Sequence, residues 1–433
     1  MILFPQVLSN HRACKPKSYE ALLTSSLFVQ GLMIPSADEY FRKIHQTLAL
    51  LDANNIRIFR SMKKHGPRNL QLIARDTGIP YPTVFARVSR LEKGGGIFHA
   101  WVNPNHTKIG LSRAMVLVSP TPGKDLLARE ALRIPGYWIR IIRSMGECNG
   151  YYSVHAVPTG NTREFEQYLE QFVPLGLASS VRVYWMDEQN STISNFDYYD
   201  PEKGKWRFEW NDWLSTLSED STKPSKVVPD NRSSSIASFD KKDLIILKEL
   251  NKDARIKLAD FARMFKITLP AAKYRFDRIK EKGLISEYVI DLVPYSPVIS
   301  DMYEVRLDFK TESQMLAKRT ILNKLPFILH HSLIRGVNSI TTRVYLPRGE
   351  INNLITLLSS LVRRGVLNNY TSLWLDPMTI TSQTFSYEYW QEGKGWQYDN
   401  RDYNEQLQNI LSTPEKVLKD LVAFQPMSIA TML

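Results

Sequence analysis

The sequence predicts an α+β fold in which a winged helix-turn-helix and a ferredoxin-like βαββαβ domain form a unit that occurs as a tandem repeat. The first observation is a phrase that occurs twice. "PTVFARVSRLEKGGGI" at 82–97 and "PAAKYRFDRIKEKGLI" at 270–285 align without a gap, at a constant offset of 188 residues. The second observation is that a similar βαββαβ succession follows each phrase. A constant offset indicates that one folding unit is used twice.

The third observation is where the charge lies. The 433-residue chain has a net charge of +12, with 43% hydrophobic and 23% charged residues, which is ordinary for a soluble globular protein. Lys and Arg exceed Asp and Glu by seven in residues 51–110 and by four in residues 239–292. A basic charge gathered around the two phrases favours a polyanionic partner. Two cysteines make no disulfide framework and no apolar run is long enough to span a membrane, so we expect a cytoplasmic protein without a membrane partner.

The first helix of each copy is indicated by apolar residues at helical spacing. They are Ile56, Phe59 and Met62 in the first copy and Leu244, Leu247 and Leu250 in the second. Asp52 is the expected N-cap of the first of these helices. A short second helix follows, and the repeated phrase is the third helix, ended by the glycines at 94–96 or by Gly283. The stretches "IFHAWV" and "ISEYVI" are each expected to form a β-hairpin wing, which completes a winged helix-turn-helix.

The third helix has an inward stripe and an outward face in both copies. The inward stripes are Val84, Val88 and Leu91, and Ala272, Phe276 and Ile279. Small residues early on the outward face allow close approach to a groove floor, and the cations further along suit phosphates. The predicted DNA-binding residues are Tyr81, Pro82, Thr83, Ala86, Arg87, Arg90 and Lys93 in the first copy and Ala271, Lys273, Tyr274, Arg275 and Arg278 in the second. Asp277 and Glu281 would repel phosphate, so the first copy is the stronger candidate.

The remaining segments divide the chain. The predicted organisation is an N-terminal extension (1–48), a first winged helix-turn-helix (49–108), a first βαββαβ domain (111–188), a tail and linker (189–238), a second winged helix-turn-helix (239–293), a second βαββαβ domain (300–377) and a C-terminal extension (378–433). Residues 215–238 are rich in Ser, Pro and charge, as linkers are. Further helices are expected at 39–51 and 404–424, and "EKGKW" and "EGKGW" mark matching tails.

These residues carry a resemblance to a known family. A winged helix with Arg-hydrophobic-x-Arg-hydrophobic and a Gly soon after, joined to a βαββαβ domain, resembles the Lrp/AsnC transcription regulators, and "FDKKDLIILKELNKDARIKLADFARMF" is the most similar stretch. The resemblance implies binding to double-stranded DNA, sheet domains that pair, higher homo-oligomers and a small-molecule effector that the sequence leaves unknown. Family members that sense amino acids carry a Gly-x-x-Asp-like turn, and neither "GECNGYYSV" nor "GVNSITTRV" has that Asp.

The repeat itself predicts an intramolecular pseudo-dimer. The second strand of the first sheet places Tyr137, Ile139 and Ile141 on one face and Trp138 and Ile142 on the other. Both faces are therefore apolar, although the helices of a βαββαβ domain cover only one of them. Two such sheets in one chain can close against each other without a second chain.

Two alternatives remain open. Siroheme decarboxylases share the architecture, and "LHHSLIRGVNSITTRVYL" places His330, His331, Arg335 and Asn338 where such an enzyme of tetrapyrrole biosynthesis would carry its functional residues. A protein-interaction scaffold that binds no DNA is the other. Because no Walker loop, nucleotide-binding glycine motif, nucleophile elbow or Cys/His cluster occurs, we expect no catalytic residue, no cofactor and no metal.

Overall fold

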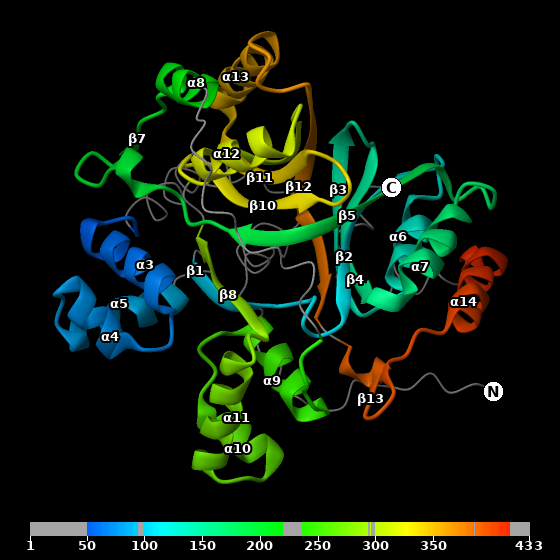
Figure 1. The fold of residues 1–433 in the computed structure, drawn as a ribbon, viewed down its shortest axis with the longest axis horizontal. Helices are drawn as coiled ribbons and strands as arrows, with labels where there is room; N and C mark the ends of the chain where they lie inside the picture. Colours follow the sequence, from blue (N-terminus) through cyan, green and yellow to red (C-terminus); the bar gives the residue numbers. More distant parts are fainter. Residues whose placement is uncertain are drawn as a thin grey trace.

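A computed structural model describes residues 50–93, 98–219, 236–292, 295, 299–384 and 386–415. It is a mixed α/β molecule in which two three-helix units lie outside a central closed barrel of strands (Figure 1). The helix expected at 39–51 and the glycines at 94–96 lie largely or wholly outside the described residues, as does most of the linker predicted at 215–238. No helix in the described ranges is long and apolar enough to cross a membrane.

The first three-helix unit consists of α3 (Ala53–His65), α4 (Leu70–Thr77) and α5 (Tyr81–Lys93). Asp52 caps α3, as predicted, because its carboxylate accepts a hydrogen bond from the Asn55 backbone. The inward stripes of α3 and α5 are fully or nearly fully buried, which confirms the helical periodicity of this part of the sequence: Ile56, Phe59, Met62, Val84, Val88 and Leu91.

The second unit repeats this arrangement with α9 (Lys241–Lys252), α10 (Leu258–Phe265) and α11 (Leu269–Glu281). Asp240 and Asp243 form a capping box at the start of α9, in which each carboxylate accepts a backbone hydrogen bond from the other residue. Gly283, with φ of 65°, follows α11 in the left-handed conformation that a helix end requires.

The wings differ from the sequence expectation. Each copy contributes one strand, β1 (Phe98–Pro104) or β8 (Ile285–Leu292), and these two strands pair antiparallel with each other. The expected hairpin within each copy is therefore wrong for the described residues. The strand that follows each wing belongs to the barrel and does not pair with the wing. The backbone amide and carbonyl groups of each wing strand form hydrogen bonds with the wing strand of the other copy instead.

Further contacts fix the two three-helix units to this shared ribbon. The Ala254 amide, just after α9, donates to the Ala100 carbonyl at 2.8 Å, and Asn251 donates to Val102 at 3.0 Å. Arg255 pairs with Glu92 of α5 at 2.7 Å. Each unit thus packs on the other copy's wing, and the ribbon sets the spacing between the two helices that we expect to contact DNA.

Each wing is followed by strands and helices in the order βαββαβ. In the first repeat these are β2 (Leu111–Pro120), α6 (Asp125–Arg133), β3 (Trp138–Gly146), β4 (Gly150–Pro158), α7 (Thr162–Glu170) and β5 (Ala178–Ser191). In the second they are β9 (Ser300–Asp308), α12 (Glu312–Leu322), β10 (Ile328–Ile334), β11 (Ser339–Pro347), α13 (Ile351–Arg363) and β12 (Asn369–Gln383). Short 3₁₀ helices lie at Thr159–Asn161, Phe196–Tyr198, Arg348–Glu350 and Tyr387–Tyr389.

The eight strands close into one barrel in the order β10-β11-β9-β12-β3-β4-β2-β5. The two halves meet at two seams, where β5 pairs with β10 and β12 pairs with β3. The last strand of each half continues to Ser191 or Gln383, past the domain ends predicted at 188 and 377. The extra residues form part of the seams with the other half.

The two faces of the first sheet face different surroundings. Tyr137, Ile139 and Ile141 pack under α6 and α7, whereas Trp138 and Ile142 belong to the core that includes the barrel interior. The sequence left open which face the helices cover. The barrel interior is therefore lined by the alternate residues of every strand.

The tail that follows the last barrel strand of each repeat packs on the other repeat. Small hairpins, β6 (Tyr199–Asp200) with β7 (Lys205–Trp206) and β13 (Trp390–Gln391) with β14 (Gly395–Trp396), lead to α8 (Trp210–Ser218) and α14 (Asn400–Ser412). Trp213 and Leu217 of α8 are buried in the core of the second repeat. Tyr403 and Leu407 of α14 are buried in that of the first. Each tail helix therefore covers the helices of the other repeat.

Candidate nucleic-acid interface

The outward face of α5 is open to solvent. Pro82, Thr83, Ala86 and Arg90 are all exposed, while the stripe beneath them is buried. Tyr81 and Phe85 add two aromatic rings that are 44% and 50% exposed. An exposed face with small residues, aromatic rings and a cation can contact both base edges and phosphates.

The turn between α4 and α5 sets the orientation of α5 relative to α4. Gly78 adopts a left-handed conformation with φ of 66° directly after α4, which a side chain would strain. The Thr77 hydroxyl donates to the Ile73 carbonyl at 2.7 Å and so closes the last turn of α4. Ile79 is buried in the turn, and α5 starts two residues later. Local sequence thus fixes the crossing angle that presents the outward face.

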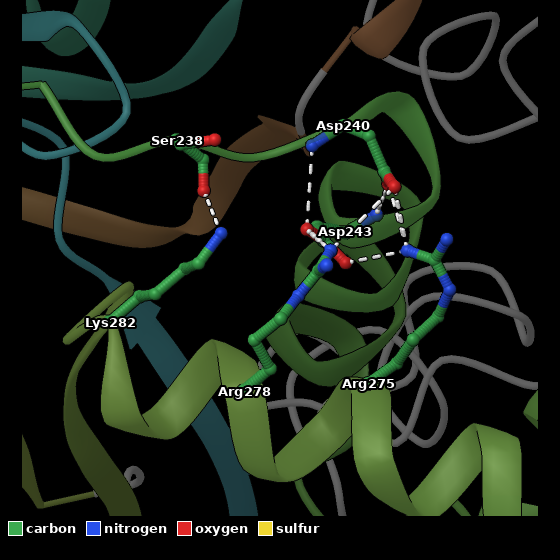
Figure 2. A network of polar contacts seen from close by, with 6 residues as sticks. All are labelled: Ser238, Asp240, Asp243, Arg275, Arg278 and Lys282. Carbon is green, nitrogen blue, oxygen red and sulfur yellow. Dashed lines mark hydrogen bonds and ion pairs between the residues drawn. The ribbon is translucent and has the colours of Figure 1, made fainter.

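In the second copy, four charged residues form a network between α9 and α11 (Figure 2). Arg275 contacts Asp240 at 2.8 Å and Asp243 at 2.9 Å. Arg278 contacts the other oxygen of Asp243 at 2.7 Å. The Asp243 side chain is fully buried. The network therefore ties the N-terminus of the first helix to the middle of the third.

The pKa shifts in this network follow from its geometry. Burial alone would lower the pKa of Arg275, but its hydrogen bonds to the two aspartates and their negative charges outweigh burial and raise that pKa. Burial would likewise raise the pKa of Asp240, and the hydrogen bond from Arg275 outweighs it, so the pKa of Asp240 is lowered. Both groups are held in their charged forms, as a structural ion pair requires.

The first copy has the same arrangement with one substitution. Asp52, Asn55, Arg87 and Arg90 stand at the positions of Asp240, Asp243, Arg275 and Arg278, each at the offset of 188. Arg87 contacts Asp52 at 2.6 Å and the Asn55 amide oxygen at 3.1 Å. Asn55 carries no charge for a second arginine. Arg90 is exposed and, within the described residues, has no ion pair.

The predicted DNA-binding residues therefore fall into two groups. Those with exposed side chains are Tyr81, Pro82, Thr83, Ala86, Arg90, Lys273 and Tyr274, with Ala271 half-buried beside them. Those engaged by the chain's own carboxylates are Arg87, Arg275 and Arg278. The Lys93 side chain lies outside what the structure describes. We assign a structural role to the three paired arginines, and DNA contact by the exposed group stays a prediction.

Sequence reasoning missed two features of this surface. Phe85 on α5 and Leu269 on α11 are exposed at 50% and 53%, although both are apolar. A helical wheel could have shown them outside the inward stripe. The second feature is the ion pair between the N-cap carboxylate of each first helix, Asp52 or Asp240, and an arginine of the third helix, which the constant offset of 188 could have revealed.

The residues of the decarboxylase alternative do not converge. His331 is fully buried and accepts a hydrogen bond from Arg319 of α12 at 2.8 Å, on the helix-covered side of β10. His330 points to the opposite side because side chains alternate along a strand. Arg335 pairs with Asp187 at 2.7 Å, and Asn338 donates to the Lys310 carbonyl. Within the described ranges, no three His, Cys, Asp or Glu side chains gather as metal ligands would.

Comparison with known proteins matches the second winged unit. Residues 239–286 match the family model described as winged helix-turn-helix DNA-binding. An uncharacterised HTH-type transcriptional regulator of Pyrococcus furiosus is 28% identical over 109 residues, which are 25% of this chain and 66% of that protein. The match spans slightly less than two thirds of the relative.

Two of the solved structures that align with this chain do so at low sequence identity. A siroheme decarboxylase, NirDL, aligns with 84% of this chain and 99% of its own at 11% identity and a TM-score of 0.45. A transcriptional regulatory protein of the ASNC family from Pyrococcus furiosus aligns with 32% of this chain and 90% of its own at 16% identity and a TM-score of 0.25. Both TM-scores are below 0.5, so neither likeness carries an argument about function.

Proposed function

We propose that this protein is a sequence-specific DNA-binding transcription regulator, built as two tandem Lrp/AsnC-like units that form a pseudo-dimer within one chain. The observation that carries the proposal is the open outward face of α5, on which Arg90 is exposed and has no ion-pair partner among the residues that the structure describes. The match of residues 239–286 to a winged helix-turn-helix DNA-binding model and the regulator relative support the same class. The net charge of +12 supports a polyanionic partner.

In this proposal the two copies contribute unequally to DNA recognition. Thr83, Ala86 and Phe85 of α5 suit the thymine methyl group, because apolar side chains and the Thr methyl make that contact in the major groove. Arg90 then reaches a phosphate. On α11 the arginines are paired, and Asp277 adds a negative charge. We therefore infer that the protein prefers an imperfect palindrome, in which α5 reads bases and α11 adds weaker contacts.

The pseudo-dimer is supported by the two shared assemblies. The β1–β8 ribbon and the two barrel seams join the repeats through backbone hydrogen bonds. These contacts make a second chain unnecessary for covering the inner sheet faces. Assembly into larger homo-oligomers and control by a small-molecule effector belong to the proposal as well, in line with the resemblance.

The test compares two equivalent arginines. Arg90→Ala removes an unpaired cation, so duplex DNA affinity should fall and the slope of log affinity against log salt should flatten by about one. Its matched control is Arg278→Ala in the other copy. That change removes one of the two arginine partners of buried Asp243 and should cost about 1–3 kcal/mol of stability with less effect on the salt slope.

Salt titrations of DNA binding and urea unfolding of both variants measure these effects. An unchanged salt slope in Arg90→Ala would remove Arg90 from the interface. Failure of the unmodified protein to show any salt-dependent retention on duplex DNA would instead favour the protein-interaction scaffold.

A further inference from the structure

One end of the barrel interior holds more positive than negative charge. Arg113 of β2, Arg140 of β3 and Arg343 of β11 lie on the inner face, together with the carboxylate of Glu304 on β9. Arg113 faces inward because its neighbours Ala114 and Val116 pack under the helices. Three guanidinium groups thus share one carboxylate in a space enclosed by eight strands.

The strand register brings these side chains together. Arg113 and Trp138 both stand opposite Ala156 of β4, one on each side. Arg343 stands opposite His330 on one neighbouring strand and opposite Glu304 on the other. Directly opposed residues on neighbouring strands are about 5 Å apart. The charges of Arg113, Arg140 and Arg343 all act on His330, so these side chains lie in one region of the barrel.

Arg113 has no hydrogen-bond acceptor within the part of the chain that the structure describes. Its Nε is buried and unpaired, and its guanidinium contacts the Trp138 ring at 5.4 Å. Arg140 lies over the same ring at 5.8 Å, so two cations share one indole. Burial, reinforced by Arg140, lowers the pKa of Arg113 to about 10. Folding normally avoids such a group, because a buried charge without a partner is costly.

The nearby carboxylates are already engaged. Glu304 binds Arg343 at 2.7 Å and also accepts from the Thr341 hydroxyl. The Nη1 of Arg343 lies 3.7 Å from the Met302 sulfur, a weak acceptor, and the Arg343 guanidinium also binds Tyr152. Glu287 of the wing lies 3.5 Å from Lys63 and accepts from Asn103. The cluster therefore keeps an excess of two positive charges.

The cluster also keeps accessible surface. Arg113, Arg140 and His330 are only part-buried, although each belongs to the inner face of a closed barrel. Arg140 lies toward the opening, since its Nε reaches the exposed Ser382 at 3.4 Å. Apolar surface from Trp138 and Tyr152 lines the same region. This end of the barrel thus combines a guanidinium Nε that has no acceptor among the described residues, excess positive charge and partly exposed side chains beside aromatic rings.

We propose that this cluster is a binding site for a small dicarboxylate, whose one carboxylate pairs with Arg113 and whose other lies between Arg140 and Arg343. A guanidinium presents two parallel N–H groups that match a carboxylate, and two negative charges balance the excess. The aromatic lining favours an organic acid over a bare inorganic anion. The site is separate from the outward face of α5 and does not depend on DNA binding.

Thermal unfolding of the full chain tests the site. The probes are succinate and glutarate, with acetate, inorganic phosphate and the neutral succinamide as comparisons, all at equal ionic strength in sodium chloride. A dicarboxylate that binds only the folded state should raise Tm by about 2 °C or more near saturation. Arg113→Met should raise Tm without ligand, because the buried unpaired charge is gone, and should abolish the dicarboxylate response.

Two further variants keep the test decisive. Arg306→Met changes another arginine of the barrel, one that contacts Asp308 at 3.3 Å and Tyr184 at 2.8 Å, so it should lower Tm and keep the response. Arg140→Met should weaken the response even if Arg113→Met does not fold. The proposal is overturned if neither dicarboxylate raises Tm, or if both Arg113→Met and Arg140→Met respond like the unmodified protein. A phosphate or acetate shift equal to that of succinate overturns the dicarboxylate assignment.

Discussion

Asn55 and Asp243 occupy equivalent positions in the two repeats. Their side chains differ only in that Asn55 ends in an amide and Asp243 in a carboxylate. Asp243 is fully buried and contacts two arginines, whereas among the described residues Asn55 accepts from one arginine, Arg87. Because an amide offers no charge, Arg90 is left in solvent while its counterpart Arg278 is held against the protein. A single side chain thus decides whether the outer arginine of the third helix is available to a partner.

Exchange of these two residues should exchange the behaviour of the two helices. Asn55→Asp should draw Arg90 into an ion pair, which lowers DNA affinity and flattens the salt slope by about one without loss of stability. Asp243→Asn should release Arg278 and steepen the slope. Salt titrations of both variants, with circular dichroism melting as the control for folding, measure the effect. Equal salt slopes in the two variants and the unmodified protein would contradict this account.

Buried histidines should make the fold sensitive to acid. His155 is fully buried, bonds Ser153 at 3.0 Å and contacts the Phe165 ring at a centroid distance of 5.2 Å. Burial lowers the pKa of His155 to about 3, while an unfolded chain takes up the proton near pH 6.5. The contribution of His155 to the free energy of unfolding is therefore complete above about pH 6.5 and is lost as the pH falls toward 3.

For one such histidine, the free energy of unfolding should change by up to about 1.4 kcal/mol per pH unit. His331, whose pKa burial and Arg319 also lower to about 3, should add a similar amount. His155→Gln should remove the contribution of His155 to the pH dependence of the free energy of unfolding. Urea unfolding at several pH values between about 4 and 7 measures this dependence. A variant that loses stability with acid as steeply as the unmodified protein would show that His155 does not titrate in this way.

At the scale of elements, the helices followed from the sequence more closely than the strand partners did. Helical periodicity depends on residues three and four apart, and it placed the inward stripes that end at Leu91 and Ile279 correctly. A strand's partner depends on residues far away in the chain. The pairing of β1 with β8 joins residues almost 190 positions apart, so a hairpin within each copy was the local interpretation.

The long strand β12 shows why a strand end was misplaced. Pro377 cannot donate to a ladder, and it therefore reads as the end of a strand. In the structure the register with β3 shifts between Asp376 and Thr381, and this irregularity accommodates the proline. Thr381, Ser382 and Gln383 then pair with the other repeat. The inward cluster around Arg113 likewise depends on tertiary packing that periodicity does not contain.

The exchanged tail helices make a prediction of their own. Leu407 of α14 is fully buried against the helices of the first repeat. Leu407→Ala should cost about 2–5 kcal/mol, since it leaves a cavity in a packed site. Hydrogen exchange should rise in α6 and α7, more than 200 residues earlier, while Glu405→Ala on the exposed face of α14 should change little. Faster exchange confined to α14 would contradict the packing.

The whole molecule is held together by contacts between its halves. Two seams close the barrel, the wings pair with each other, and each tail helix covers the opposite repeat. A single repeat would leave open strand edges and an uncovered apolar helix face, both of which favour association with another chain.

A cut between the repeats should therefore leave the molecule intact. With a protease site inserted between residues 219 and 236, the cleaved fragments should remain a 1:1 complex, because the seams do not depend on that connection. Light scattering should give the mass of the uncut chain, and the melting temperature should become dependent on concentration. Fragments that separate as folded monomers would show that the seams contribute little.

The β1–β8 ribbon has an evolutionary consequence. When a gene encodes one unit that pairs with itself, every inherited substitution appears on both sides of the pair. Here the two wings belong to one chain, so each side can mutate independently while their pairing preserves the common frame. The difference between Asn55 and Asp243 is a change of this kind. Selection can therefore adjust one half of a recognition surface while the other half stays as it was.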